Sequence, residues 1–337
     1  MSSATLARPV RRAATALMAA TAVLAGLTAC GSTTDDDAST IVRTTTRIAG
    51  AGVVGIERDT RAACATPTPA DPGAPDPQRI VVLDSAAMDS VCALGLWERV
   101  VGAATGSGDT PQPSYLGTGI SELPSIGPVS NPDMARIREA APELILGSAP
   151  ASPELAGQLN AVAPTVFTGG DPVFWKAQFL ASGKAMGRAV AAQQALDSYL
   201  ADAARTGTDI DARLTQASVI LFRSDTTAIE GPGSFSGQVL ADAGVQRPPY
   251  QRIDVASKDI DNLGDAEGDL IYVSFDGSDG LTHGTEVMES DAWHELGAVT
   301  DNRVFAVEDE IWNAGNGLVA ARAVLTDLRA TLNGYVN

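Results

Sequence analysis

Short apolar runs bounded by Gly, Pro and Ser recur along the chain, and segments with helical spacing lie between them. In the first half the runs cover residues 79–83 (RIVVL), 100–104 (VVGAA), 144–148 (LILGS) and 164–168 (PTVFT). In the second half they cover residues 217–222 (ASVILF), 269–275 (DLIYVSF) and 303–307 (RVFAV). Runs of this length are typical of buried strands. The alternation predicts an α/β fold with mostly parallel, helix-covered sheets.

One long segment interrupts the alternation. Residues 173–205 contain no proline, and their apolar residues recur at spacings compatible with one helix face. A helix of that length would extend ~50 Å, which exceeds the width of a single lobe. We therefore predict one long rigid helix over residues 172–206 that joins an N-terminal lobe, residues 79–171, to a C-terminal lobe, residues 207–337.

Residues 1–29 have the pattern of an export signal. Arg8, Arg11 and Arg12 precede an apolar stretch at 13–27, and the sequence LTAC ends at Cys30. This order is similar to the lipobox of bacterial lipoproteins, in which the cysteine is acylated and becomes the new N-terminus. About 15 apolar residues are too few to cross a hydrocarbon core of ~30 Å. We expect residues 1–29 to be a signal peptide and Cys30 to anchor the protein by lipid outside the cytoplasm. Residues 30–78 would then form a tether and N-terminal arm.

The remaining cysteines fit an exported protein. With Cys30 lipidated, Cys64 and Cys92 are left as an even pair, and an oxidising compartment favours a disulfide between them. Such a bond would contribute roughly 3 kcal/mol to stability. The alternative is that Cys92, inside an apolar run, is a buried free thiol.

Composition and charge narrow the class of protein. The 337 residues are 45% hydrophobic, which excludes a coiled coil, a disordered chain and a collagen-like rod. A net charge of -18 repels phosphate backbones and disfavours a nucleic-acid partner. The chain has 2 histidines and no nucleophile motif or Cys-x-x-Cys pair, so we expect neither an enzyme nor a bound metal or cofactor. We expect a monomer.

Several motifs resemble those of iron(III)-siderophore-binding lipoproteins of ABC importers, and their order is closest to the actinobacterial, especially mycobacterial, branch. The motifs are the lipobox, RIVVL at 79–83, PDMARI at 132–137, PELIL at 142–146, GPGSF at 231–235 and DNRVF at 301–305. The resemblance runs from about residue 79 to 333. It implies a class III periplasmic-binding-protein fold, in which two α/β lobes joined by a single rigid helix hold a ferric siderophore between them. Haem is the alternative ligand, with Tyr115 or His283 as an axial donor.

The sequence departs from this family at two positions that dock to the permease. Family members commonly carry a glutamate on each lobe that pairs with permease arginines, and the corresponding residues here are Ala135 and Gln238. Either other acids, Asp133 or Glu139 with Asp242, replace these glutamates, or the protein is an adaptor that passes its ligand to another carrier.

Ligand contacts in such a fold come from loops beyond the carboxyl ends of the strands. The residues selected there are Tyr115, Trp175, Arg223, Phe235, Trp312 and Asn313, and a wider set adds Asp84, Ser85, Ser148, Phe174, Ser234 and Phe275. Aromatic faces would cover the apolar parts of a siderophore, and Arg223 would donate to its oxygen ligands. The alternatives are core packing for the aromatic residues and a surface ion pair for Arg223.

Overall fold

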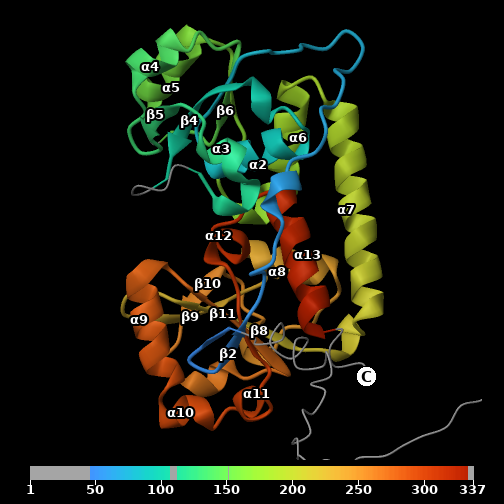
Figure 1. Ribbon diagram of the computed structural model, residues 1–337, viewed down its shortest axis with the longest axis vertical. Helices are drawn as coiled ribbons and strands as arrows, with labels where there is room; N and C mark the ends of the chain where they lie inside the picture. Colours follow the sequence, from blue (N-terminus) through green and yellow to red (C-terminus); the bar gives the residue numbers. More distant parts are fainter. Residues whose placement is uncertain (1–45, 107–111, 151, 333–337) are drawn as a thin grey trace, which may run out of the picture. The chain divides into compact units, whose positions relative to one another are not determined.

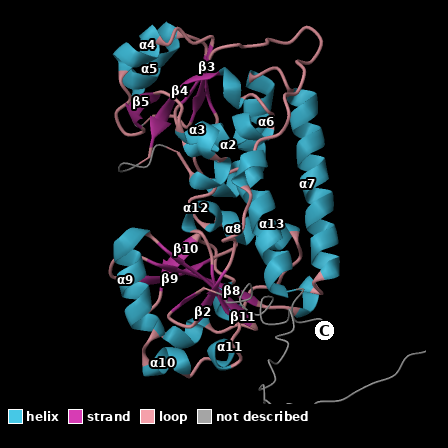
Figure 2. Ribbon diagram, in the orientation of Figure 1, coloured by secondary structure: helices cyan, strands magenta, loops and turns pink. Residues whose placement is uncertain are grey.

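The computed structural model describes residues 46–106, 112–150 and 152–332, which lie in one compact unit, Thr45–Asn337. The predicted signal peptide and Cys30 lie outside the described residues. Two separate β-sheets, each covered by helices, make up the described part of the chain (Figures 1 and 2). The predicted α/β class with mostly parallel sheets is confirmed.

The N-terminal sheet has the strand order β5-β4-β3-β6-β7, and every pairing in it is parallel. Its strands are β3 (Ile80–Val82), β4 (Val100–Thr105), β5 (Ser125–Pro128), β6 (Leu144–Gly147) and β7 (Thr165–Phe167). Its helices are α2 (Ser85–Ala93), α3 (Thr118–Ser121), α4 (Met134–Glu139) and α5 (Pro153–Val162). Short 3-10 helices are η1 (Thr60–Ala62), η2 (Trp97–Arg99), η3 (Ser114–Leu116) and η4 (Pro172–Phe174). The parallel order places the carboxyl ends of all five strands at one edge.

The C-terminal sheet has the order β1-β2-β12-β11-β8-β9-β10 and is mixed. Its strands are β1 (Arg47–Ile48), β2 (Ala51–Val53), β8 (Ala217–Phe222), β9 (Thr227–Glu230), β10 (Ser257–Asp259), β11 (Leu270–Phe275) and β12 (Val304–Ala306). Its helices are α8 (Phe235–Asp242), α9 (Gly277–Met288), α10 (Asp291–His294), α11 (Gly297–Thr300), α12 (Asp309–Trp312) and α13 (Leu318–Leu332), with 3-10 helices η5 (Ala212–Leu214), η6 (Pro249–Gln251) and η7 (Leu263–Ala266). The pairings β2–β12, β12–β11 and β11–β8 are parallel, whereas the pairings β1–β2, β8–β9 and β9–β10 are antiparallel.

The segment predicted as one continuous helix is two helices. They are α6 (Trp175–Ala185) and α7 (Ala189–Asp209), and Gly187 between them has a left-handed backbone with φ 69°. A β-carbon on Gly187 would lie 1.9 Å from the carbonyl oxygen of Pro75, so the chain passes too close here for a side chain. The long helix of the molecule is therefore α7 alone, and it begins later than predicted.

The segment before residue 79 is part of the fold and not only a tether. Strand β2 pairs in parallel with β12 at the edge of the C-terminal sheet. The chain then runs toward the N-terminal sheet, as the blue ribbon in Figure 1 shows. There Cys64 and Cys92 are joined by a disulfide, which ties this segment to α2. We call residues 46–78 the arm.

The largest apolar cluster contains residues from both halves of the chain. It includes Val91 of α2, Leu94 just after that helix, Trp175 of α6, Val219 of β8 and Val324 of α13, all at most 1% exposed. Burial of this kind contributes ~25 cal/mol per Å² of apolar surface, so the contact between the halves is itself a source of stability. Among the described residues, no helix has both the length and the apolar character needed to cross a membrane.

Candidate functional site

The two faces of the C-terminal sheet differ in what covers them. Ile220, Ile229 and Val273 pack with Met288 of α9 and Trp293 of α10 in one apolar cluster. Because side chains alternate along a strand, their neighbours Leu221, Glu230 and Ser274 belong to the opposite face. On that opposite face polar side chains gather near the carboxyl ends of β8 and β11. We call this set the polar patch; it comprises Arg223, Glu230, Ser257, Asp259, Ser274, Asp309 and Asn313.

Arg223 follows the last residue of β8 and reaches across β9 to β10. Its Nη1 donates to Asp259 Oδ1 at 3.0 Å, and its Nη2 donates to Ser257 Oγ at 2.9 Å. The same Nη2 lies 3.8 Å from Glu230 Oε1, within ion-pair distance. The register of β9 and β10 explains this arrangement, since Ser257 pairs with Glu230. One guanidinium thus faces two carboxylates and a hydroxyl.

Helix α12 completes the polar patch beside β11. Asn313 follows this helix, and its Nδ2 donates to Asp309 Oδ1 at 2.9 Å and also to Ser274 Oγ. These two bonds fix the amide orientation, because an ionised carboxylate only accepts. Asn313 Oδ1 has no hydrogen-bond donor within the described part of the chain.

Burial and neighbouring charges shift the pKa values of two carboxyl groups in the polar patch. Burial raises the pKa of Glu230, while its hydrogen bond with Ser257 and the charge of Arg223 oppose that rise. Burial also raises the pKa of Asp309, with smaller upward contributions from Asp276 and Glu310. The site therefore holds carboxylates that are close enough to influence one another.

A contact between the two halves adjoins the polar patch. Ser114 of η3 donates to Glu310 Oε2 of α12 through its backbone N–H at 2.8 Å and through its hydroxyl at 2.6 Å. Ser114 belongs to the loop beyond the carboxyl end of β4. The loop after β4 of the N-terminal sheet therefore contacts α12, the helix that follows β12 of the C-terminal sheet.

Two predicted contact residues lie in the core instead. Trp175 and Phe235 are each 1% exposed, and their ring centroids are 5.7 Å apart in an edge-on contact. Trp175 also meets Tyr199 edge-on at 5.4 Å. The physical reason is that residues next to a loop in sequence can still point inward at the start of a helix. These rings join α6, α7 and α8.

Trp312 and Tyr115 are also buried, at 0% and 2% exposure. The Trp312 ring lies 4.4 Å from that of Tyr272, and its Nε1 donates to Asp327 Oδ2 at 2.9 Å. The Tyr115 hydroxyl donates to Asp89 Oδ2 at 3.1 Å. Each polar atom has an internal partner, which explains why aromatic residues beside loops are tolerated inside.

The two candidate haem donors do not converge. Tyr115 is engaged with Asp89, as above. His283 of α9 lies on the face of the sheet opposite the polar patch, where its Nε2 is 3.2 Å from Thr227 Oγ1 and its ring contacts Phe222. In the part of the chain that the structure describes, no group of three His, Cys, Asp or Glu side chains is placed to hold a metal ion.

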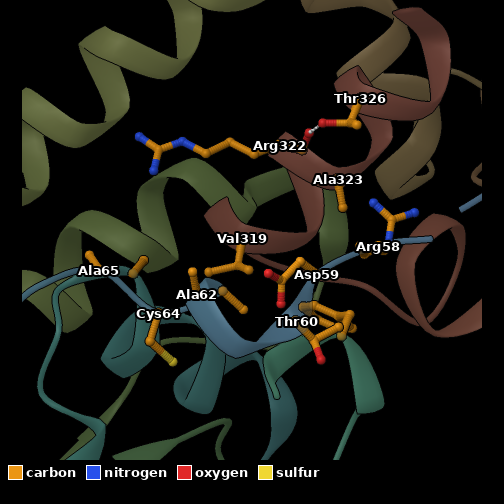
Figure 3. Close-up of a pocket in the computed structure, with 13 residues that line it drawn as sticks. Arg58, Asp59, Thr60, Ala62, Cys64, Ala65, Val319, Arg322, Ala323 and Thr326 are labelled. Atoms are coloured by element: carbon orange, nitrogen blue, oxygen red, sulfur yellow. Dashed lines mark hydrogen bonds between the residues drawn. The ribbon is translucent and has the colours of Figure 1, made fainter. Parts of the chain in front are cut away.

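Two pockets lie elsewhere. One of about 280 Å³ lies between the arm and α13, with arm residues on one side and residues 319–326 of α13 on the other (Figure 3). This volume is below the 300–1,000 Å³ of typical ligand sites. The other, about 380 Å³, includes Gln216 and Asp269, at the amino ends of β8 and β11. Ligands of α/β sheets bind at the carboxyl ends, so the polar patch remains the better candidate.

Of the six residues selected from sequence, Arg223 and Asn313 belong to the polar patch. The other members of the patch, Glu230, Ser257, Asp259, Ser274 and Asp309, were missed. Glu230 and Asp259 lie on β9 and β10, whose sequences TAIE and SKD are too short and too polar to indicate strands.

Comparisons with known proteins extend this description. Residues 80–311 match the family model described as periplasmic binding protein. The probable siderophore-binding lipoprotein YfiY of Bacillus subtilis (strain 168) is 26% identical over 272 residues, which cover 75% of this chain and 82% of that protein. The achromobactin-binding periplasmic protein of Dickeya dadantii (strain 3937) is 23% identical over 267 residues, with 75% and 85% covered. The crystal structure of Staphylococcus aureus SirA complexed with staphyloferrin B has a TM-score of 0.67 at 26% identity, covering 77% of this chain and 94% of that one.

Proposed function

The chain belongs to the periplasmic binding protein family, and from this premise we propose that it captures a ferric siderophore outside the cytoplasm for iron uptake. The observation that carries the proposal is the polar patch at the strand ends, in a chain whose relatives include a probable siderophore-binding lipoprotein and a staphyloferrin B complex. A chelated ferric ion brings its own oxygen ligands, so the protein needs only to contact the organic shell.

An exposed aromatic residue supports this proposal from the N-terminal side. Phe174 follows the end of β7 and is 61% exposed, although the neighbouring Trp175 is buried. Exposed aromatic faces suit the apolar parts of a siderophore. Haem is not favoured as a ligand, because Tyr115 and His283 have internal partners in different places.

We propose that export and lipidation at Cys30 hold the protein at the outer face of the cell membrane, where it would serve an ABC importer. One relative in Bacillus subtilis (strain 168) is a putative ABC transporter substrate-binding lipoprotein. Docking to the importer would need charged residues other than the two docking glutamates, because Ala135 and Gln238 stand at those positions here. Asp133 caps its own helix, α4, and Asp242 accepts from Lys176 Nζ and Tyr199 Oη, so these two of the three proposed replacements, the third being Glu139, already have partners. This observation keeps the adaptor role as the second candidate.

The test is a titration of the purified mature protein with ferric siderophores and with haem, followed by tryptophan fluorescence. We expect at least one ferric siderophore to saturate the signal with one site per chain. Phe174→Ala should weaken that binding by roughly 1–3 kcal/mol, the usual range for an aromatic anchor. Tyr250→Ala is the matched control, because Tyr250 is 65% exposed at the amino ends of the strands. Binding of haem alone, with a spectrum that changes in Tyr115→Phe, would contradict the proposal.

A further inference from the structure

Arg223 is the cation of the polar patch, and its terminal nitrogens already have partners. Nη1 is bonded to Asp259 and Nη2 to Ser257, with Glu230 Oε1 3.8 Å from Nη2. A charged hydrogen bond is among the stronger contacts in a protein, and breaking it leaves the partner uncompensated. Arg223 is therefore held as a counter-ion for the carboxylates around it.

Two buried acceptors in the polar patch lack donors. Glu230 is 5% exposed, and its Oε1 receives no hydrogen bond from any described residue. The same holds for Asn313 Oδ1, whose amide nitrogen is committed to Asp309 and Ser274. Buried acceptors are nearly always satisfied in proteins, and an exception calls for an explanation. A ligand that brings N–H donors would satisfy both atoms.

Negative charge dominates around these acceptors. The carboxylates in and beside the polar patch belong to Glu230, Asp259, Asp276, Asp309 and Glu310, and the guanidinium that faces them within the patch is that of Arg223. Arg247, the other nearby cation, is 7% exposed and donates to the backbone oxygens of Ala217 and Glu230. It partly offsets the charge of Glu230, and its terminal nitrogens donate within the protein, while its buried Nε has no partner among the described residues.

We propose that the polar patch selects ferric chelates that carry a protonated amine over neutral and polyanionic ones. An ammonium group has three N–H donors and a positive charge, so it complements the orphan acceptors Glu230 Oε1 and Asn313 Oδ1. A ferric tris-catecholate, which is a trianion, meets carboxylates instead. This inference rests on the proposed function and adds the charge class of its ligand.

An anionic chelate could bind only if Arg223 turned away from its present partners. That movement would take the charge of Arg223 away from the buried carboxylate of Glu230 and leave it only Ser257 and the partial offset from Arg247, which costs stability. Asp259, at 62% side-chain exposure, would lose less because water can solvate it. The cost at Glu230 therefore favours a ligand that leaves Arg223 in place.

The experiment compares three ferric probes on the full mature protein. Ferrioxamine B carries a free ammonium group, ferrioxamine E is the neutral cyclic trihydroxamate, and ferric enterobactin is the anionic tris-catecholate. We expect ferrioxamine B to bind about tenfold or more tightly than ferrioxamine E, the scale of one charge-assisted hydrogen bond, and ferric enterobactin to bind weakest. The preference for ferrioxamine B over ferrioxamine E should shrink as added salt screens the charges, although salt screens the buried carboxylate of Glu230 less than the exposed one of Asp259.

Two variants assign the effect to the polar patch. Glu230→Gln keeps the side-chain shape and should remove most of the preference for ferrioxamine B over ferrioxamine E. Asp259→Asn, at a side chain that is 62% exposed, should reduce the preference and improve binding of ferric enterobactin. Glu295→Gln is the control with the same charge change, because Glu295 is exposed on the far side of the sheet beside α10.

The outcomes separate this inference from the proposed function. Equal affinity for both ferrioxamines, or tighter binding of ferric enterobactin, would overturn the charge selection while the proposed function stands. An unchanged preference in both Glu230→Gln and Asp259→Asn would overturn it as well. If none of the three probes nor any other ferric chelate binds, the proposed function fails and this inference fails with it.

Discussion

At the scale of single residues, Trp312 shows that a tryptophan next to a loop can have a wholly internal role. Its ring packs on Tyr272, and its Nε1 satisfies the buried carboxylate of Asp327, which is 2% exposed. Asp327 also accepts from Arg58 of the arm at 2.8 Å. The indole therefore links α12 to α13 and indirectly to the arm.

We predict that Trp312→Phe lowers stability and leaves ligand affinity unchanged. Phenylalanine keeps most of the ring packing but removes the donor to Asp327, and an unsatisfied buried acceptor costs about 1–3 kcal/mol. Chemical denaturation measures the first effect, and fluorescence titration measures the second. Weakened siderophore binding without loss of stability would show that Trp312 touches the ligand after all.

Asp89 is the buried carboxylate with the clearest link between the two halves. It lies on α2, is 0% exposed, and accepts from the backbone N–H groups of Val319 and Ala320 in the first turn of α13, at 2.9 and 3.0 Å. It thus caps a helix of the other half. Burial raises its pKa to about 6, and its hydrogen bonds, including that from Tyr115, oppose the rise.

This raised pKa predicts a pH dependence of stability. In the unfolded chain Asp89 titrates near 3.8 and in the folded chain its pKa is about 6. Between these values the folded state binds more protons, so the free energy of unfolding falls as pH rises from about 4 to about 6. The fall due to Asp89 is about 3 kcal/mol, since one unit is worth 1.36 kcal/mol. Denaturation of the wild type and Asp89→Asn across this range should show a flatter profile in the variant. Parallel profiles would contradict the assignment.

At the scale of elements, the break between α6 and α7 depends on one glycine. Gly187→Ala would force a β-carbon onto a left-handed backbone and to within 1.9 Å of the Pro75 carbonyl oxygen. We predict a loss of stability of about 1–3 kcal/mol or more, because the arm must shift as well. Gly157→Ala in α5 is the control: nothing lies within 4 Å of the place that its new methyl group would occupy, and it should stabilise by about 0.5–1 kcal/mol. Thermal denaturation of both variants measures the contrast, and equal melting temperatures would refute it.

The same elements show what the sequence could predict and what it could not. Strands such as β8 and β11 were predictable because each is a buried apolar run, and local composition carries that signal. The polar patch was predictable only in part. Arg223 directly follows β8, and Asn313 lies shortly after β12, and both strands are apolar runs that the sequence shows. Glu230 lies on β9, a strand that is stabilised by pairing with its neighbours and is not revealed by its composition. The burial of Trp175 also depends on α7 and α8, which contact it from distant parts of the chain.

At the scale of the whole described molecule, several independent contacts hold the two halves together. The largest apolar cluster is continuous through both. Asp89 caps α13 across the contact, and Ser114 donates to Glu310 beside the polar patch. The arm is paired with β12 at one end and tied to α2 by the disulfide of Cys64 at the other. Hinge closure would have to break or stretch all of these contacts.

We therefore predict that ligand binding changes the relative position of the two halves very little. Hinge motions are absorbed by a few loop residues, and here the arm and the buried cluster add constraints beyond α7. Small-angle scattering curves of the mature protein with and without a saturating ferric siderophore should overlay. Reducing the disulfide, or replacing Ser114 by Ala, should allow a larger ligand-dependent change if these contacts are the restraint. A marked drop in the radius of gyration of the unaltered protein on binding would show that the contacts between the halves are weaker than their burial indicates.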